Sequence, residues 1–351
     1  MQSKKQACND APILGRAGLG LGERDMRIAL SLALLAAGPA LAQATWEPTK
    51  TIEIVVPFAP GGASDQMART IQSIIQKNAL TKQSVVVVNK PAAAGGEAMM
   101  DMRAASGDPH KLVTTSSAIY MIPMSSKLPV TWRDLTPIAM LAQDEFLLWT
   151  YTDAPFKTAR EFMAAAKTSS PAIKIGGNGS KREDHLISSS LERESGGKIT
   201  YIPYTGGGPT SVQLAGKHIE ASTGNPSEEI GSWRAGNARP LCVMSPQRMA
   251  YTAKITADMA WSDVPTCKEH GVDFTYNMLR GMFMPGKVTP AQQAYYVNLF
   301  RRVAETPEWK TYMDRNALLP DFRDGEAFTK FLTTDEARHK ELMGQAGFLA
   351  Q

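Results

Sequence analysis

A strand, a glycine-rich loop and a helix are predicted in succession within residues 52–77, and this unit constrains the fold more than any other stretch. Residues 52–56 form a short run rich in Ile and Val, which favours a β-strand. The apolar residues of 67–75 recur every three or four positions, which is the period of an amphipathic helix. Similar strand and helix patterns alternate along the rest of the chain, so the sequence predicts an α/β protein.

The loop between this strand and helix combines features that suit an anion site. Gly61 and Gly62 permit backbone angles that a side chain would forbid, and Ser64 or Asp65 can cap the helix. Because free N–H groups converge at a helix N-terminus, a helix entered through such a loop can bind an anion. The alternative is that these residues only cap a βα unit, since turns of that kind commonly carry Gly, Ser and Asp.

The same order of strand, glycine turn and helix start recurs later, at residues 173–180. Between the two units, the apolar run 85–88 is predicted to be a buried parallel strand. A further strand at 112–117 ends in Thr and Ser residues, among them Ser116. Open α/β sheets bind ligands at the carboxyl ends of their strands, so Ser116 is a candidate ligand contact.

The chain is long enough for two domains. Its 351 residues are 43% hydrophobic and 21% charged, which is typical of a globular protein with real cores. We predict that residues 45–148 with 280–351 form domain 1 and that 149–279 form domain 2. The crossovers near 146–152 and 274–285 would then act as hinges between them.

Residues 1–44 are predicted to be a leader that ends in a secretory signal peptide. A basic flank precedes an apolar run, and small residues offer cleavage sites near Ala42 or Ala44. The run is too short and too rich in Ala to favour the alternative of a retained membrane anchor. We therefore expect the mature protein in the periplasm. The choice of start codon, Met1 or Met26, stays open.

Composition and spacing argue against several other classes of protein. Removal of the leader takes away five basic and three acidic groups and lowers the formal charge from +4 to +2, so nucleic-acid binding is not expected. Gly-x-Gly-x-x-Gly and His-x-x-x-His patterns are missing from the sequence, so we expect no nucleotide cofactor and no metal. Ser180 and His185 lie too close in sequence for a serine triad, and we expect no enzyme.

Cys242 and Cys267 could form a disulfide or remain two buried thiols.

A set of motifs follows in a fixed order from about Trp46 to the end of the chain. The set consists of Val56-Pro-Phe-Ala-Pro-Gly-Gly-Ala-Ser-Asp65, Asn89-Lys-Pro91 with Gly95-Gly96, Gly177-Asn-Gly-Ser180 with His185-Leu186, Tyr201-Ile-Pro-Tyr-Thr-Gly-Gly-Gly-Pro209, Asn225-Pro-Ser227 and Asp263-Val-Pro-Thr266. This ordered set resembles the Bug family, the periplasmic solute-binding receptors associated with tripartite tricarboxylate transporters.

The resemblance implies a type II periplasmic-binding-protein fold, in which two α/β domains close on an organic anion in the cleft between them. It implies that the Pro-Gly-Gly loop of one domain and the Gly-x-Gly-Ser loop of the other hold a ligand carboxylate, partly through water. Two opposed helix N-termini would supply N–H groups and positive dipole ends without a buried Arg. The expected ligand-binding residues are Phe58, Pro60, Gly61, Gly62, Ala63, Ser64, Asp65, Ser116, Gly177, Asn178, Gly179, Ser180, His185, Tyr204 and Asn225.

Within this set, Asp65 is expected to act as a cap, and His185 either contacts the ligand or packs its helix. The resemblance also implies the partners, namely a small organic acid and the membrane subunits of a tripartite tricarboxylate transporter, with the receptor a monomer. A periplasmic sensor that presents a carboxylate to a signalling receptor is the alternative.

The sequence departs from the family pattern at residues 181–184, where Lys-Arg-Glu-Asp replaces small polar residues. The two cations would favour a multiply charged or aromatic acid, or they would only form a solvated helix face. Whether the carboxylate is aliphatic, aromatic or an amino acid therefore stays open.

Overall fold

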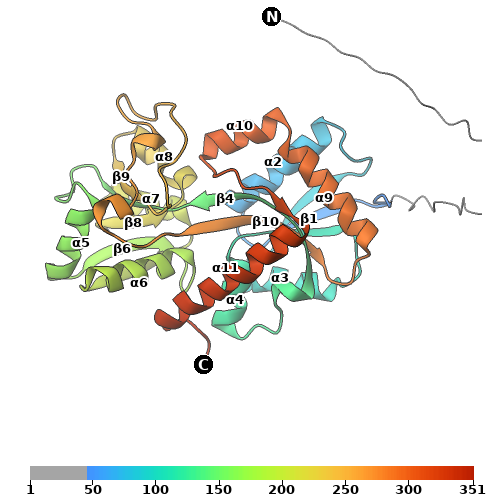
Figure 1. Ribbon diagram of the computed structural model, residues 1–351, viewed down its shortest axis with the longest axis horizontal. Coiled ribbons are helices and arrows are strands. Elements are labelled where there is room, and N and C mark those ends of the chain that lie inside the picture. Colours follow the sequence, from blue (N-terminus) through green and yellow to red (C-terminus); the bar gives the residue numbers. More distant parts are fainter. Residues whose placement is uncertain (1–45) are drawn as a thin grey trace, which may run out of the picture. The chain divides into compact units, whose positions relative to one another are not determined.

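Two β-sheets organise residues 46–351, which are the residues that the computed structural model describes (Figure 1). The predicted leader and its cleavage sites lie outside these residues. Each sheet combines parallel with antiparallel strands, and helices pack beside each of them. This arrangement confirms the predicted α/β class with two domains.

The first sheet is built from both ends of the described chain. Its strands are β1 (Ile52–Val56), β2 (Val85–Asn89), β3 (Lys111–Thr115), β4 (Leu135–Glu145), β10 (Asn277–Pro285) and β11 (Arg323–Asp324). They lie in the order β11-β4-β10-β3-β1-β2. β1 pairs in parallel with β2 and β3, whereas β10 runs antiparallel to β3 and β4. The C-terminal strands thus complete the sheet that the N-terminal ones begin.

The helices beside this sheet bury the apolar positions that the sequence pattern marks. In α2, the predicted period is confirmed, because Met67, Ile71, Ile74 and Ile75 are all buried. The α-helices of this half are α2 (Ala63–Lys77), α3 (Gly96–Ala104), α4 (Ala118–Ser126), α9 (Pro290–Ala304), α10 (Pro307–Asn316) and α11 (Gly325–Gln345). Two short 3₁₀ turns, η1 (Ala92–Gly95) and η2 (Trp132–Asp134), connect elements of the same half.

The second sheet comes from the middle of the chain. Its strands are β5 (Leu147–Tyr151), β6 (Ile173–Asn178), β7 (Ile199–Tyr204), β8 (Ala221–Gly224) and β9 (Ala238–Val243), in the order β7-β6-β8-β5-β9. β6 is parallel to its neighbours, and β5 is antiparallel to both of its own. Its helices are α5 (Ala159–Thr168), α6 (Glu183–Ser195), α7 (Gly207–Ala215) and α8 (Pro226–Arg234), followed by the turns η3 (Trp261–Asp263) and η4 (Lys268–His270).

The chain passes between the sheets at two places. Phe146 alone separates β4 from β5, and residues 244–276 connect β9 back to β10 (Figure 1). Both places fall inside or next to the predicted crossovers. The domain boundaries at 148, 149, 279 and 280, and a hinge role for these segments, stay predictions.

One predicted strand is less buried than expected. β2 forms at 85–89 and pairs in parallel with β1, but it is the edge strand of its sheet. Val85 is buried, whereas Val86 is 39% exposed. The prediction of a fully buried strand was wrong because an all-Val run does not reveal whether a second neighbour follows it.

A disulfide between Cys242 and Cys267 resolves the alternative that the sequence left open. Cys242 belongs to β9, and Cys267 precedes η4, with the two Cα atoms 4.9 Å apart. Both residues are buried. The bond ties the segment after β9 to the second sheet.

Replacing both cysteines with Ala should lower the free energy of unfolding by about 3 kcal/mol, because the unfolded chain gains the freedom of a loop of 25 residues. Urea denaturation of wild type and variant measures the difference. Dithiothreitol should destabilise the wild type and leave the variant unchanged; equal stability of the two proteins without reductant would contradict the prediction.

Candidate functional site

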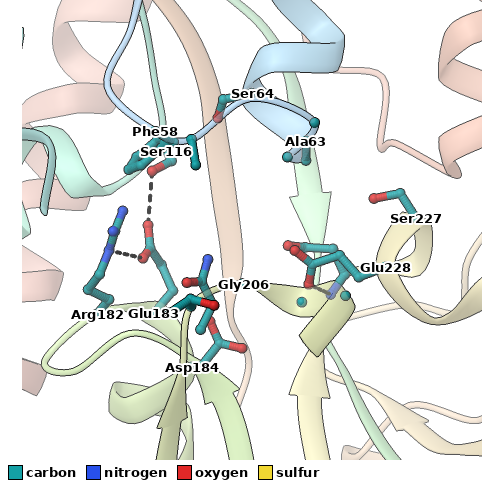
Figure 2. Close-up of a pocket in the computed structure, with 18 of the residues that line it drawn as sticks. Phe58, Ala63, Ser64, Ser116, Arg182, Glu183, Asp184, Gly206, Ser227 and Glu228 are labelled. Carbon is teal, nitrogen blue, oxygen red and sulfur yellow. Dashed lines mark hydrogen bonds and ion pairs between the residues drawn. The ribbon is translucent and has the colours of Figure 1, made fainter. Parts of the chain in front are cut away.

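A cavity of about 600 Å³ lies between residues of the first sheet and residues of the second (Figure 2). This volume is in the range that small-molecule sites occupy. From the first half come the loop before α2, Ser116 after β3, and Arg280 of β10. From the second half come the end of β6 and the residues that begin α6, α7 and α8.

Asp65 fixes the loop that leads into α2. Its Oδ2 accepts hydrogen bonds from the Gly61 N–H and from Arg69 Nε, each at 2.9 Å, and its Oδ1 accepts one from Asn89 Nδ2 at 2.9 Å. Burial raises the pKa of Asp65, but the hydrogen bonds from Arg69, Gly61 and Asn89 outweigh it and hold the pKa below its usual range. The carboxylate is therefore a structural part of the loop. The expectation that it caps the N–H groups of the helix was wrong, because Gly62 is the N-cap of α2 and the backbone N–H that Asp65 accepts is that of Gly61, before the helix.

The first turn of α2 keeps free hydrogen-bond donors at the cavity. Among the described residues, the N–H groups of Ala63 and Ser64 have no acceptor, as expected at a helix N-terminus. Ala63 and Ser64 both line the cavity. The positive end of the helix dipole lies at the same place, so this side of the cavity can hold an anion.

A buried ion pair supports this turn. Arg280 Nε donates to Asp144 Oδ2 at 3.0 Å, and Arg280 Nη1 donates to Ser64 Oγ at 3.1 Å. The side chains of Arg280 and Asp144 are 5% and 1% exposed. Charges this deeply buried need a partner, and here the pair also orients the Ser64 hydroxyl.

The opposite wall of the cavity carries two buried carboxyl groups, those of Asp184 and Glu228, that form no ion pair within the described residues. Glu228 Oε2 accepts from the Asn225 N–H at 3.4 Å, and burial together with the nearby Asp144 raises the pKa of Glu228 to about 7. Burial, reinforced by the charges of Glu228 and Glu183, raises the pKa of Asp184 well above its usual range. In the described part of the chain, neither Asp184 nor Glu228 pairs with a Lys, Arg or His side chain.

Two contacts bridge the cavity between its walls. Ser116 Oγ donates to Glu183 Oε1 at 3.0 Å, and Figure 2 shows these side chains pointing toward one another. The Arg182 guanidinium lies 4.6 Å from the centre of the Phe58 ring, a cation–π contact. Arg182 Nε is also 3.8 Å from Glu183 Oε2. The start of α6 is thus tied to the first half of the molecule.

One model of a known protein family matches most of this chain. The model of the tripartite tricarboxylate transporter family receptor, TctC, matches residues 67–348. The chain belongs to this family. Its members are solute-binding receptors of the periplasmic-binding-protein type and not enzymes, which confirms the resemblance to Bug proteins and the predicted fold.

Individual relatives of this receptor agree with the family model. BugT from Bordetella pertussis is 30% identical over 209 residues, which cover 58% of this chain and 63% of BugT. A TctC solute-binding protein from Polaromonas, solved without ligand, is 28% identical with a TM-score of 0.67, over 85% of this chain and 99% of that one. MatC from Rhodopseudomonas palustris, solved with bound malate, has the same fold at 21% identity, with a TM-score of 0.70 over 84% and 99% of the two chains.

The cavity brings together part of the predicted site of this receptor. The predicted residues that line it are Phe58, Pro60, Gly61, Gly62, Ala63, Ser64, Ser116, Asn178 and Asn225. The predicted residues outside its lining are Asp65, Gly177, Gly179, Ser180, His185 and Tyr204. Ligand contact by any residue of either group stays a prediction.

The residues outside the lining have visible structural roles. His185 stacks on Tyr201 with ring centres 4.1 Å apart and accepts a hydrogen bond from the Lys181 N–H at Nδ1, so its contacts are those of helix packing. A Cβ at Gly177 would lie 2.4 Å from the Asp184 Cβ. Glycine at this position therefore allows α6 to approach β6.

Sequence reasoning missed several residues at the cavity, and above all Arg280. The expectation was that helix N-termini could hold an anion without a buried Arg, and the structure places one at the cavity in addition. Arg280 is the one charge in the apolar stretch 277–285, which was predicted only to be a crossover. Glu228 is an acid in the first turn of α8, where acids are common, so the sequence pattern does not reveal its position at the cavity.

Membrane-spanning helices and clusters of metal ligands are both absent from residues 46–351. None of the helices there is both long and apolar enough to cross a membrane. Nor does this part of the chain hold three or more His, Cys, Asp or Glu side chains grouped so as to bind a metal ion.

Replacing Asp65 with Asn should lower the free energy of unfolding by about 1–3 kcal/mol at pH 7, because the loop loses charge-assisted hydrogen bonds. The pKa of Asp65 is lower in the folded chain than in the unfolded one, so its carboxylate stabilises the fold above pH 4 or so. That contribution disappears as pH falls through the folded pKa.

The difference between wild type and Asp65→Asn should therefore shrink from pH 7 toward pH 3, as measured by urea denaturation at several pH values. Asp273→Asn is the matched control, because Asp273 is exposed. A difference that stays constant over the whole pH range would argue against the role of this carboxylate.

Proposed function

We propose that this receptor captures a small organic carboxylate in the periplasm and delivers it to the membrane subunits of a tripartite tricarboxylate transporter. The observation that carries the proposal is the anion-binding end of the cavity. There, the free N–H groups of Ala63 and Ser64, the Ser64 hydroxyl and the positive end of α2 converge, with the Arg280 guanidinium behind them. A carboxylate matches these donors in charge and geometry.

The family and its solved members support the same class of ligand. The receptor family serves tripartite tricarboxylate transporters, and MatC, which shares this fold, was solved with malate. The predicted signal peptide supports export to the periplasm, where such a receptor meets its solute. We expect the receptor to act as a monomer.

The proposed mechanism is binding without chemistry. An open form admits the ligand, and the carboxylate then contacts both walls of the cavity. Because these contacts exist only when the two walls are close, the ligand binds the closed form more tightly than the open form and shifts the equilibrium toward it. The membrane subunits then recognise the closed receptor.

A thermal-shift screen of the mature protein against aliphatic and aromatic carboxylates tests the proposal, with nucleotides and sugars as controls. A ligand that binds the native state only, at 100 times its Kd, stabilises the protein by about 2.7 kcal/mol. The melting temperature should then rise by several degrees for at least one acid. An unchanged melting temperature with every acid, in protein freed of bound solute by unfolding and refolding, would contradict the proposed carboxylate function.

Replacing Gly61 with Leu should weaken carboxylate binding at least tenfold. Gly61 lines the cavity with a φ of +84°, where a side chain strains the backbone by about 1–2 kcal/mol and distorts the loop before α2. Isothermal titration with the best acid of the screen measures the loss.

Gly107→Leu is the control for this variant. Gly107 has a φ of +88° and open space around it, as Gly61 does, but it lies before β3, at the other end of that strand from Ser116. Both variants should lose similar stability, and only Gly61→Leu should lose affinity. Equal affinity of the two variants would contradict a role for the loop in binding.

A further inference from the structure

Glu183 already accepts the one hydrogen bond that the Ser116 hydroxyl can donate at the cavity. The Ser116 hydroxyl has one proton, which it donates to Glu183 Oε1, and its oxygen accepts the Ala118 N–H at 3.2 Å. Ser116 and Glu183 are 3% and 5% exposed. Ser116 therefore has no donor left for a ligand carboxylate while this contact stands.

The cations at the cavity are matched by the protein's own carboxylates. Arg182 lies beside Glu183 Oε2, and Arg280 is paired with Asp144. Asp184 and Glu228 add further carboxyl groups to the same wall without adding a cation. Arg182 therefore does not give this wall a net positive charge, because the Glu183 carboxylate lies beside it.

Two groups of residues that line the cavity consequently differ in the charge that they accept. Ala63 and Ser64 offer donors to one carboxylate. At the pair of Ser116 and Glu183, a second carboxylate would meet a like charge, and the two Arg side chains that line the cavity, Arg182 and Arg280, already lie beside protein carboxylates. A neutral hydrogen-bond donor or a cationic group would instead find an acceptor in Glu183.

We propose that Glu183 is a specificity-determining residue, a resident carboxylate that restricts this receptor to ligands with a single carboxylate and an uncharged or cationic other end. The inference rests on the proposed function, since it concerns which carboxylates the cleft admits. It sets this receptor apart from MatC, whose bound malate has two carboxyl groups.

Matched pairs of acids test the inference on the wild-type protein without any substitution. Isothermal titration compares pentanoate and 5-aminopentanoate with pentanedioate, and butanoate and 4-aminobutanoate with butanedioate, at pH 7.5. We expect the better monocarboxylate of each set to bind at least tenfold more tightly than the dicarboxylate. Dicarboxylates that bind as tightly as the monocarboxylates, or more tightly, would overturn the inference and leave the carboxylate function standing.

Glu183→Gln provides the second measurement. Its amide oxygen can still accept a hydrogen bond from Ser116, while the negative charge is gone. The variant should therefore gain affinity for the dicarboxylates, and the ratio of monocarboxylate to dicarboxylate affinity should fall about tenfold or more below that of the wild type. Glu194→Gln, on the exposed face of the same helix, is the control and should keep the wild-type preference.

The outcomes separate the two proposals. An unchanged preference in a folded Glu183→Gln protein would show that Glu183 does not set the ligand class, even if the wild type favours monocarboxylates. If no acid of either kind binds to the wild type or to the variants, the carboxylate function itself fails, and the inference fails with it.

Discussion

The buried ion pair between Arg280 and Asp144 is the interaction on which the site depends. It joins β10 and β4, the two strands that lead toward the second sheet, and it reaches Ser64 in the first turn of α2. An isolated charge at this depth would be strongly unfavourable, so neither side chain can be replaced alone without leaving its partner unpaired. The geometry of the first turn of α2 is therefore coupled to the strands that connect the two halves.

This coupling suits the closure on a ligand that we propose for this receptor. Phe146 directly follows β4, so a displacement of the second sheet acts on the end of the strand that carries Asp144. The contacts of Ser116 with Glu183 and of Phe58 with Arg182 also join the two halves. In the proposed mechanism, a ligand that replaces or extends these contacts changes the free energy of the closed form relative to the open one.

The sequence predicted the parts of this architecture that local pattern determines. The strand, loop and helix of residues 52–77 formed as expected, since apolar periodicity and glycine positions act over a few residues. Long-range features were not predictable in the same way. The edge position of β2 depends on which strands pair, and the partnership of Arg280 with Ser64 joins residues that are 216 positions apart. The glycine turn at 177–180 was predicted to start a helix, but α6 begins later, at Glu183, and of these four residues only Asn178 lines the cavity.

Gly177 has a structural role that its motif does not reveal. The resemblance implies a ligand contact for this glycine, which stays a prediction. In the structure, its missing side chain makes room for Asp184, so that the start of α6 approaches β6 closely. The same close approach brings Glu183 to Ser116, because Glu183 and Asp184 are consecutive. A glycine that allows close helix packing therefore also helps to determine where the carboxylate of Glu183 lies.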